Sequence, residues 1–113
     1  MLVLMKRVTR QNCPILRATN IVGDQWSLLI LREFFLEGKR RFADLQAELG
    51  LSPNTLSARL KKLEEAGLLS RHVYTQHPPR AEYALTEKGR AFGPVMNALY
   101  DWGIEHTPDV IGD

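Results

Sequence analysis

Two short amphipathic segments joined by a tight turn, at about residues 42–67, constrain the fold of this chain more than any other feature. The second segment starts as a helix should, because Ser52 is a good N-cap and Pro53 follows at the first helical position. Gly50 and Gly67 end the two segments. The apolar residues of the second segment recur at i, i+4 and i+7 and share one face: Leu56, Leu60 and Leu63. This pattern is typical of a helix-turn-helix, although helical hairpins in bundles share much of it.

The face opposite these leucines is small, polar and basic, as suits a recognition helix that enters the major groove of DNA. The residues predicted to contact base edges are Asn54, Thr55, Ser57 and Lys61. Arg59 and Lys62 are predicted to bind phosphates. The remaining residues of the predicted DNA-binding surface on this helix are Ser52, Pro53 and Ala58.

After Gly67 the helical periodicity gives way to alternation, which predicts a β-hairpin at about residues 69–85. Pro78 and Pro79 fall at its expected tip, where they cost no ladder hydrogen bond. A hairpin directly after a recognition helix is the wing of a winged helix. The wing residues predicted to contact the DNA backbone or a narrow minor groove are Arg71, His77 and Arg80.

Charge is distributed in a way that favours a polyanionic partner more than the net charge of +2 does. Residues 52–80 hold five Lys or Arg against two Glu, and residues 39–41 form a predicted basic turn before the helix-turn-helix. A solvated surface would explain such a mild excess equally well. The basic turn likewise has two interpretations, because it could contact a backbone phosphate or be an ordinary solvated loop.

The flanking segments predict the core and a dimer interface. We expect residues 1–12 to form a flexible N-terminal arm, or a strand that orders only in a dimer, and residues 13–113 to form one mainly helical α+β domain. A first helix is predicted from Cys13 and Pro14 onward, and a second, capped by Asp24, from Gln25 to about Glu37 at the buried centre.

A final helix is predicted at about residues 86–104, capped by Thr86, with a wide apolar stripe. The stripe either covers the core of its own domain or pairs with a second copy, and DNA half-sites favour the symmetric pair. The residues predicted to form the dimer interface are Ile15, Leu16, Phe92, Val95, Met96, Leu99, Tyr100 and Trp102.

Other classes of function have little support in the residues. One cysteine and three scattered histidines match no zinc, metalloprotease or phosphate-loop motif, so we expect neither an enzyme nor a metal or other cofactor. No apolar run approaches the ~18 residues of a membrane span, and we expect a cytoplasmic protein. A winged helix that binds only proteins is the alternative, although its exposed face lacks an apolar anchor.

Three stretches together resemble the HxlR-type transcriptional regulators, small winged-helix proteins close to the multiple-antibiotic-resistance regulators. The stretches cover roughly residues 13–102 and are CPILRATNIVGDQWSLLILREFFLEGKRRFADLQ, LSPNTLSARLKKLEEAGLLSR and YTQHPPRAEYALTEKGRAF. The resemblance implies a homodimer, joined through the first and last helices, that binds double-stranded DNA sequence-specifically at an inverted repeat. Many members carry G-G-K-W where this chain has Gly23, Asp24, Gln25 and Trp26, so one phosphate contact is expected to be weaker.

Cys13 precedes a proline near the N-terminus, as the sensing cysteine does in some relatives that respond to oxidants, quinones or aldehydes. A thiol at a helix start with Arg10 and Arg17 nearby is expected to react readily, and two copies in a dimer could form a disulfide. The alternative is a helix-start residue that senses nothing. Any pocket for a small effector is expected between the DNA-binding part and the dimer helices, among residues such as Trp26, Phe34 and Trp102, which serve equally well as core.

Overall fold

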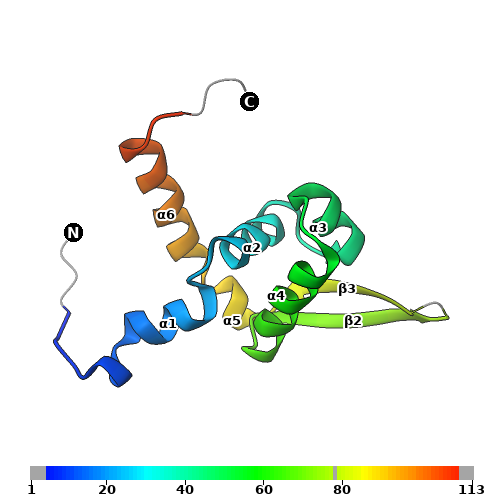
Figure 1. Cartoon of the computed structure of the whole chain (residues 1–113), viewed down its shortest axis with the longest axis horizontal. Helices are drawn as coiled ribbons and strands as arrows, with labels where there is room; N and C mark the ends of the chain where they lie inside the picture. Colours follow the sequence, from blue (N-terminus) through cyan, green and yellow to red (C-terminus); the bar gives the residue numbers. More distant parts are fainter. Residues whose placement is uncertain (1–4, 78, 110–113) are drawn as a thin grey trace.

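Helix α2 (Gln25–Glu37) lies at the centre of the molecule, with the other helices and the sheet arranged around it (Figure 1). The computed structural model describes residues 5–77 and 79–109. Asp24 caps α2 as predicted, because its side chain accepts a hydrogen bond from the backbone N–H of Ser27. The helix buries Ser27, Ile30, Leu31, Glu33 and Phe34, and the predicted bounds and central position of this helix are confirmed.

The helix-turn-helix consists of α3 (Phe42–Leu49) and α4 (Pro53–Glu65). Gly50 ends α3 in the left-handed region at φ 66°, which glycine adopts without strain. At the other end of α4, Gly67 has φ 85°, and the N–H of Leu68 bonds to the carbonyl of Leu63 at 2.9 Å. With the bond from the N–H of Gly67 to the carbonyl of Glu64, also at 2.9 Å, this forms a Schellman cap, which turns the chain sharply from α4 into the sheet.

Three antiparallel strands form the sheet, in the order β1 (Arg40–Arg41), β3 (Pro79–Leu85) and β2 (Leu69–Gln76). The hairpin of β2 and β3 extends away from the helices (Figure 1). The predicted basic turn at residues 39–41 is wrong, because Arg40 pairs with Tyr83 and Arg41 with Glu82. Two residues are too few to show alternation in a sequence, but an otherwise unpaired edge of β3 provides backbone partners for them.

The single C-terminal helix predicted at residues 86–104 is also wrong. The structure has a one-turn helix α5 (Glu87–Arg90) and a separate helix α6 (Gly93–His106). Pro94 explains the break, because proline has no N–H to donate to the preceding turn and is tolerated at a helix start. Thr86 caps α5 as predicted by accepting from the N–H of Gly89 at 3.1 Å.

The N-terminal segment also differs from a plain arm, because residues Arg10–Asn12 form a 3-10 turn (η1) before α1 (Pro14–Val22). Residues 1–4 of the predicted arm lie outside the described residues. Cys13 and Pro14 start α1 as predicted. Helices α1 and α6 project at the opposite end of the molecule from the hairpin tip (Figure 1).

The core lies between α2, the helix-turn-helix and the base of the sheet. A winged helix of mainly helical α+β class is therefore confirmed, with leucine as the dominant core residue. The buried apolar residues are Val22, Ile30, Leu31, Phe34, Leu45, Leu51, Leu56, Leu60, Leu63, Leu68 and Leu69.

Candidate nucleic-acid interface

One face of α4 is exposed and carries small polar and basic side chains. The leucines at i, i+4 and i+7 are buried and orient the helix so that the opposite face meets solvent. The exposed residues of α4 that were predicted to contact DNA are Pro53, Asn54, Ser57, Ala58, Lys61 and Lys62, and Ser52 is exposed at its N-cap. The structure therefore brings most of the predicted helix surface together on one side.

Thr55 lies at the edge of this face and is half-buried. Its backbone N–H donates to the hydroxyl of Ser52 at 3.3 Å, and that hydroxyl donates to Oγ1 of Thr55 at 3.0 Å. These bonds close the first turn of α4. The Ser52 side chain therefore caps α4, and the Thr55 hydroxyl accepts the hydrogen of the capping hydroxyl.

Arg59 and Lys62 lie on the flank of α4 that faces the start of α2. Nε of Arg59 donates to Oδ2 of Asp24 at 2.9 Å, and Nζ of Lys62 is 3.8 Å from Oδ1 of the same carboxylate. Sequence reasoning placed both cations toward phosphate and treated Asp24 only as a helix cap. Asp24 and Arg59 are 35 positions apart in the chain, so the pairing forms only in the folded protein.

The carboxyl of Asp24 is held by several donors. Partial burial by itself raises its pKa, but hydrogen bonds from the hydroxyl and N–H of Ser27 and from Arg59, with the Arg59 charge, outweigh burial. Together these effects lower the pKa of Asp24 from 3.8 to about 2. Asp24 is therefore a carboxylate at any pH at which the protein would bind DNA.

The wing carries the remaining residues that are predicted to contact DNA. His77 and Arg80 are exposed near the hairpin tip, and Arg80 pairs with Thr75 across the ladder. Pro78 lies outside the described residues. Nε of Arg71 is 4.0 Å from Oε2 of Glu64 on α4, so this cation sits closer to an internal acid than the other two.

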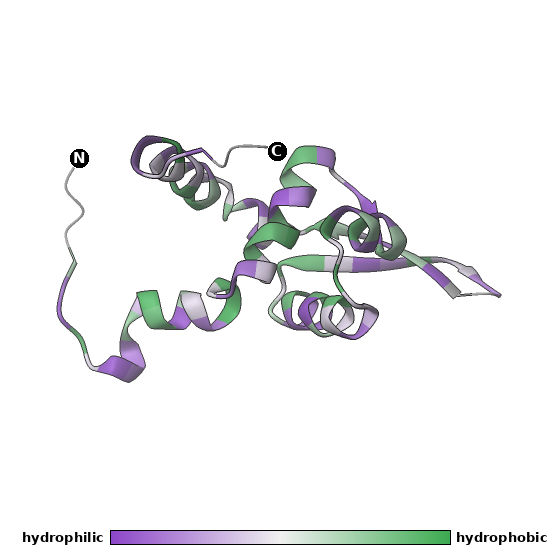
Figure 2. Ribbon diagram, turned by 45° about the horizontal axis from the view of Figure 1, so that its top comes forward, coloured by the Kyte–Doolittle hydropathy of each residue, from purple (hydrophilic) through white to green (hydrophobic). Residues whose placement is uncertain are grey.

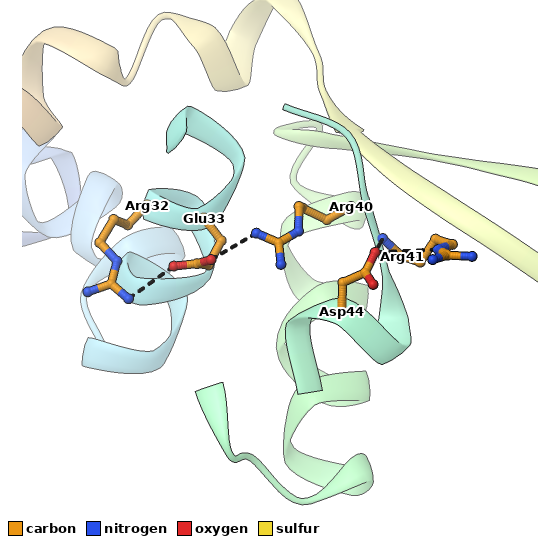
Figure 3. Close-up of polar contacts among 5 residues, drawn as sticks. All are labelled: Arg32, Glu33, Arg40, Arg41 and Asp44. Carbon is orange, nitrogen blue, oxygen red and sulfur yellow. Dashed lines mark hydrogen bonds and ion pairs between the residues drawn. The ribbon is translucent and has the colours of Figure 1, made fainter. Parts of the chain in front are cut away.

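A buried ion pair that the sequence analysis did not predict joins β1 to α2 (Figure 3). Glu33 is only 3% exposed, and its Oε1 accepts from Nη1 of Arg40 at 2.9 Å. Its Oε2 accepts from Nη2 of Arg32 at 3.0 Å. Arg40 therefore points inward, which contradicts a phosphate-binding role for that member of the basic turn. The available signal was an acidic residue at an apolar position of α2, between Ile30 and Phe34.

The two cations beside Arg40 lie differently. Nε of Arg41 is 3.4 Å from Oδ2 of Asp44, whose carboxylate also accepts from the backbone N–H of Arg41 and so starts α3. Lys39 is exposed, with Nζ 3.9 Å from Oε1 of Glu82. Both remain at the surface beside the helix-turn-helix.

The sequence model described as HxlR-like helix-turn-helix matches residues 21–110, which include α2, the helix-turn-helix, the wing and α6. This chain belongs to the HxlR-like helix-turn-helix family. The resemblance expected from the three sequence stretches is thus confirmed. The family and the relatives described below are transcriptional regulators, which are not enzymes.

Curated relatives support the same family. An HTH-type transcriptional regulator of Mycobacterium tuberculosis is 48% identical over 92 residues, which cover 81% of this chain and 58% of the relative. One from Synechocystis is 44% identical over 92 residues, covering 80% of this chain and 67% of the relative. This chain therefore spans a little over half the length of the mycobacterial relative.

Solved structures share the HxlR-like architecture. The redox regulator HypR in its reduced form is 30% identical, with a TM-score of 0.75 over 81% of this chain and 91% of that one. Its oxidised form is 32% identical, with a TM-score of 0.76 over 87% of this chain and all (100%) of that one. In both matches a sequence identity of 30% or more accompanies the similarity in fold.

The residues predicted for an HxlR-like dimer interface fall into two groups. Ile15, Val95, Leu99, Tyr100 and Trp102 are exposed, and apolar residues recur along the projecting helices α1 and α6 (Figure 2). Phe92 and Met96 instead pack against the core of their own chain, and Leu16 is half-buried. The apolar stripe of the last helix is therefore packed against its own core in one part and exposed in another.

A hollow of about 420 Å³ lies between α2 and α6. Of the residues named for such a pocket, Phe34 is 2% exposed in the core and Trp26 packs against that core, which is the core alternative, whereas Trp102 is 59% exposed beside His106. The apolar residues that line it are Leu28, Leu29, Phe35, Leu36, Met96 and Leu99.

Cys13 is a half-buried free thiol at the N-cap of α1.

Within residues 5–77 and 79–109, no group of three or more His, Cys, Asp or Glu side chains is placed to hold a metal ion. In the same part of the chain, none of the helices combines the length and the apolar character needed to cross a bilayer.

Proposed function

We propose that this chain is a cytoplasmic, sequence-specific DNA-binding transcriptional regulator that acts as a homodimer on an inverted-repeat operator. The observation that carries the proposal is the exposed polar and basic face of α4, held outward by three buried leucines and followed at once by a wing. Family membership supports the same function. Among the residues that the structure describes, this face of α4 exposes no apolar anchor of the kind that would favour a protein partner.

In the proposed complex α4 lies in the major groove and the wing lies along the flanking backbone. Asn54, Ser57 and Lys61 contact base edges, because they are exposed at the centre of the outward face. His77 and Arg80 contact phosphates or a narrow minor groove from the wing. Base contacts then provide the sequence preference, and phosphate contacts fix the position of α4.

The proposed dimer forms through α1 and α6. These helices project from the winged helix and expose apolar side chains that a second copy would cover (Figures 1 and 2). Pairing through them would present two α4 helices about one helical turn of DNA apart, which is the spacing that an inverted repeat requires. Replacement of Leu99 by Asp should convert the dimer to monomers in sedimentation velocity, whereas replacement of the exposed Glu87 by Gln should not.

We also propose that Cys13 confers a response to oxidants. Its half-buried thiol at the start of α1 lies next to the proposed dimer interface, and the solved structures of the redox regulator HypR share the fold. An intermolecular disulfide would change the spacing of the two α4 helices. If Cys13→Ser leaves oxidant-dependent release of DNA intact, Cys13 is only a helix cap.

Selection from a random pool of DNA duplexes tests the function directly, with the protein reduced in one arm and diamide-oxidised in the other. Enrichment of an inverted repeat supports a dimeric, sequence-specific regulator. Loss of enrichment on oxidation supports the role of Cys13. The absence of enrichment in both arms would contradict sequence-specific binding and favour a winged helix that binds proteins.

A further inference from the structure

We propose that Asp24 limits the sequence-independent affinity of the DNA-binding surface, because its carboxylate takes the place of a backbone phosphate beside two cations of α4. This inference rests on the proposed DNA-binding function and assigns a residue that tunes it. Asp24 is a positioning residue in this role, since it acts through Arg59 and Lys62 and contacts no base.

The geometry joins the start of α2 to one flank of the recognition helix. Oδ2 of Asp24 accepts from Nε of Arg59 at 2.9 Å, and Oδ1 lies 3.8 Å from Nζ of Lys62. Arg59 and Lys62 are three residues apart on α4, so their side chains leave the helix on the same flank. One carboxylate therefore faces both cations.

Ser27 holds this carboxylate in place. Its backbone N–H donates to Oδ2 at 3.0 Å and its hydroxyl donates to Oδ1 at 2.7 Å, and Ser27 itself is fully buried. The carboxylate also sits at the N-terminus of α2, where the helix dipole favours an anion. Asp24 therefore cannot swing away from Arg59 without losing its own capping bonds.

An arginine, a lysine and a helix N-terminus that converge on one point are the donors that bind a phosphate in other proteins. Here an internal anion already satisfies them. A DNA phosphate that approached Arg59 would have to replace a bound carboxylate and would meet its negative charge at short range. The flank of α4 therefore adds less backbone affinity than its two positive charges suggest.

Phosphate contacts strengthen binding to every sequence, whereas base contacts distinguish sequences. With the flank neutralised, discrimination depends more on the exposed face around Ser57 and Lys61. The protein would then dissociate from random DNA more readily, which shortens the time spent at sites other than the operator.

The test measures the salt dependence of binding to a random duplex and to the selected operator. Asp24→Asn keeps a side chain that caps helices well but removes the charge. We expect random-duplex affinity to rise about five- to tenfold near 0.1 M salt, and the slope of log K against log salt to steepen by about one unit. Arg59→Ala in the Asp24→Asn background should abolish most of this gain.

Glu87→Gln is the matched control, because it makes the same change in net charge at an exposed position of α5, outside the proposed DNA-binding and dimer surfaces. It should change the slope little. Asp24→Ser, which also retains a capping oxygen, provides a second variant if Asp24→Asn fails to fold by circular dichroism.

The outcomes separate the two proposals. A wild-type protein that binds neither duplex in a salt-dependent way overturns the proposed function and this inference together. A wild-type protein that binds, with an unchanged slope or weaker random-duplex binding in both Asp24 variants, overturns this inference alone.

Discussion

The buried carboxylate of Glu33 accepts a hydrogen bond from Nη1 of Arg40 at 2.9 Å and so ties strand β1 to helix α2 (Figure 3). Because β1 pairs with β3, this contact links the wing to the centre of the fold. It also fixes the chain immediately before α3. The orientation of the wing relative to the helix-turn-helix therefore depends on an ion pair inside the protein.

We expect Glu33→Gln to lower the free energy of unfolding by about 3 kcal/mol, because it leaves the Arg40 charge buried without its partner. Urea unfolding monitored by circular dichroism measures the change. Glu105→Gln on α6 is the control, since that side chain is 76% exposed and should cost less than about 0.5 kcal/mol. Similar losses in both variants would contradict a special role for the buried pair.

Asp24 should make stability depend on acid pH. Its pKa is about 2 in the folded protein against 3.8 for the free side chain, so the folded state binds the proton less tightly than the unfolded chain. The resulting stabilisation is complete above about pH 4 and is lost as the pH falls to about 2. Allowing for partial exposure, we expect about 1–2 kcal/mol.

The measurement compares wild type with Asp24→Asn in urea unfolding at several pH values. The stability difference between them should be largest near pH 6 and should shrink below pH 4. A difference that stays constant across this range would show that Asp24 contributes only as a neutral cap.

Gly89 provides a test of close backbone packing. A Cβ added there would lie 2.2 Å from the carbonyl oxygen of Leu68, and backbone cannot move aside cheaply. We expect Gly89→Ala to cost about 2 kcal/mol or more of unfolding free energy. Gly103→Ala is the matched control, because no atom of the described residues, apart from the neighbouring α6 backbone, lies within 4 Å of its added Cβ and alanine favours the α6 helix. Equal thermal stability of the two variants would refute the packing argument.

Asn54→Ala should relax the preference for one base pair of the selected operator and cost about 1–3 kcal/mol of binding there. Its exposed position at the start of α4 is the reason for the expectation. Competition between the operator and its single-base variants measures the effect. An equal loss on operator and random DNA would instead make Asn54 a backbone contact.

Local signals determined most of the helices and their ends. The caps at Asp24, Ser52 and Thr86, with the glycines after α2, α3 and α4, act within a few residues and were visible in the chain. The outward face of α4 followed from the spacing of its leucines. A single C-terminal helix does not form, because Pro94 lacks the N–H that would continue α5 and is placed at the start of α6.

Long-range pairings could not be predicted in the same way. β1 is only two residues long and forms because it pairs with the edge of β3. A segment this short has no alternation of apolar and polar residues from which a strand could be predicted.

Capping, hydrophobic periodicity and motif residues act locally along the chain, so the amino-acid sequence was sufficient to predict the helix-turn-helix, the wing and the family. Which charges face solvent depends on the folded protein. Arg40 is bound by Glu33 and Arg59 by Asp24, and these pairs join residues that are 7 and 35 positions apart. An ion pair forms where folding brings its members within a few ångströms, so the partner of a cation is a property of the fold.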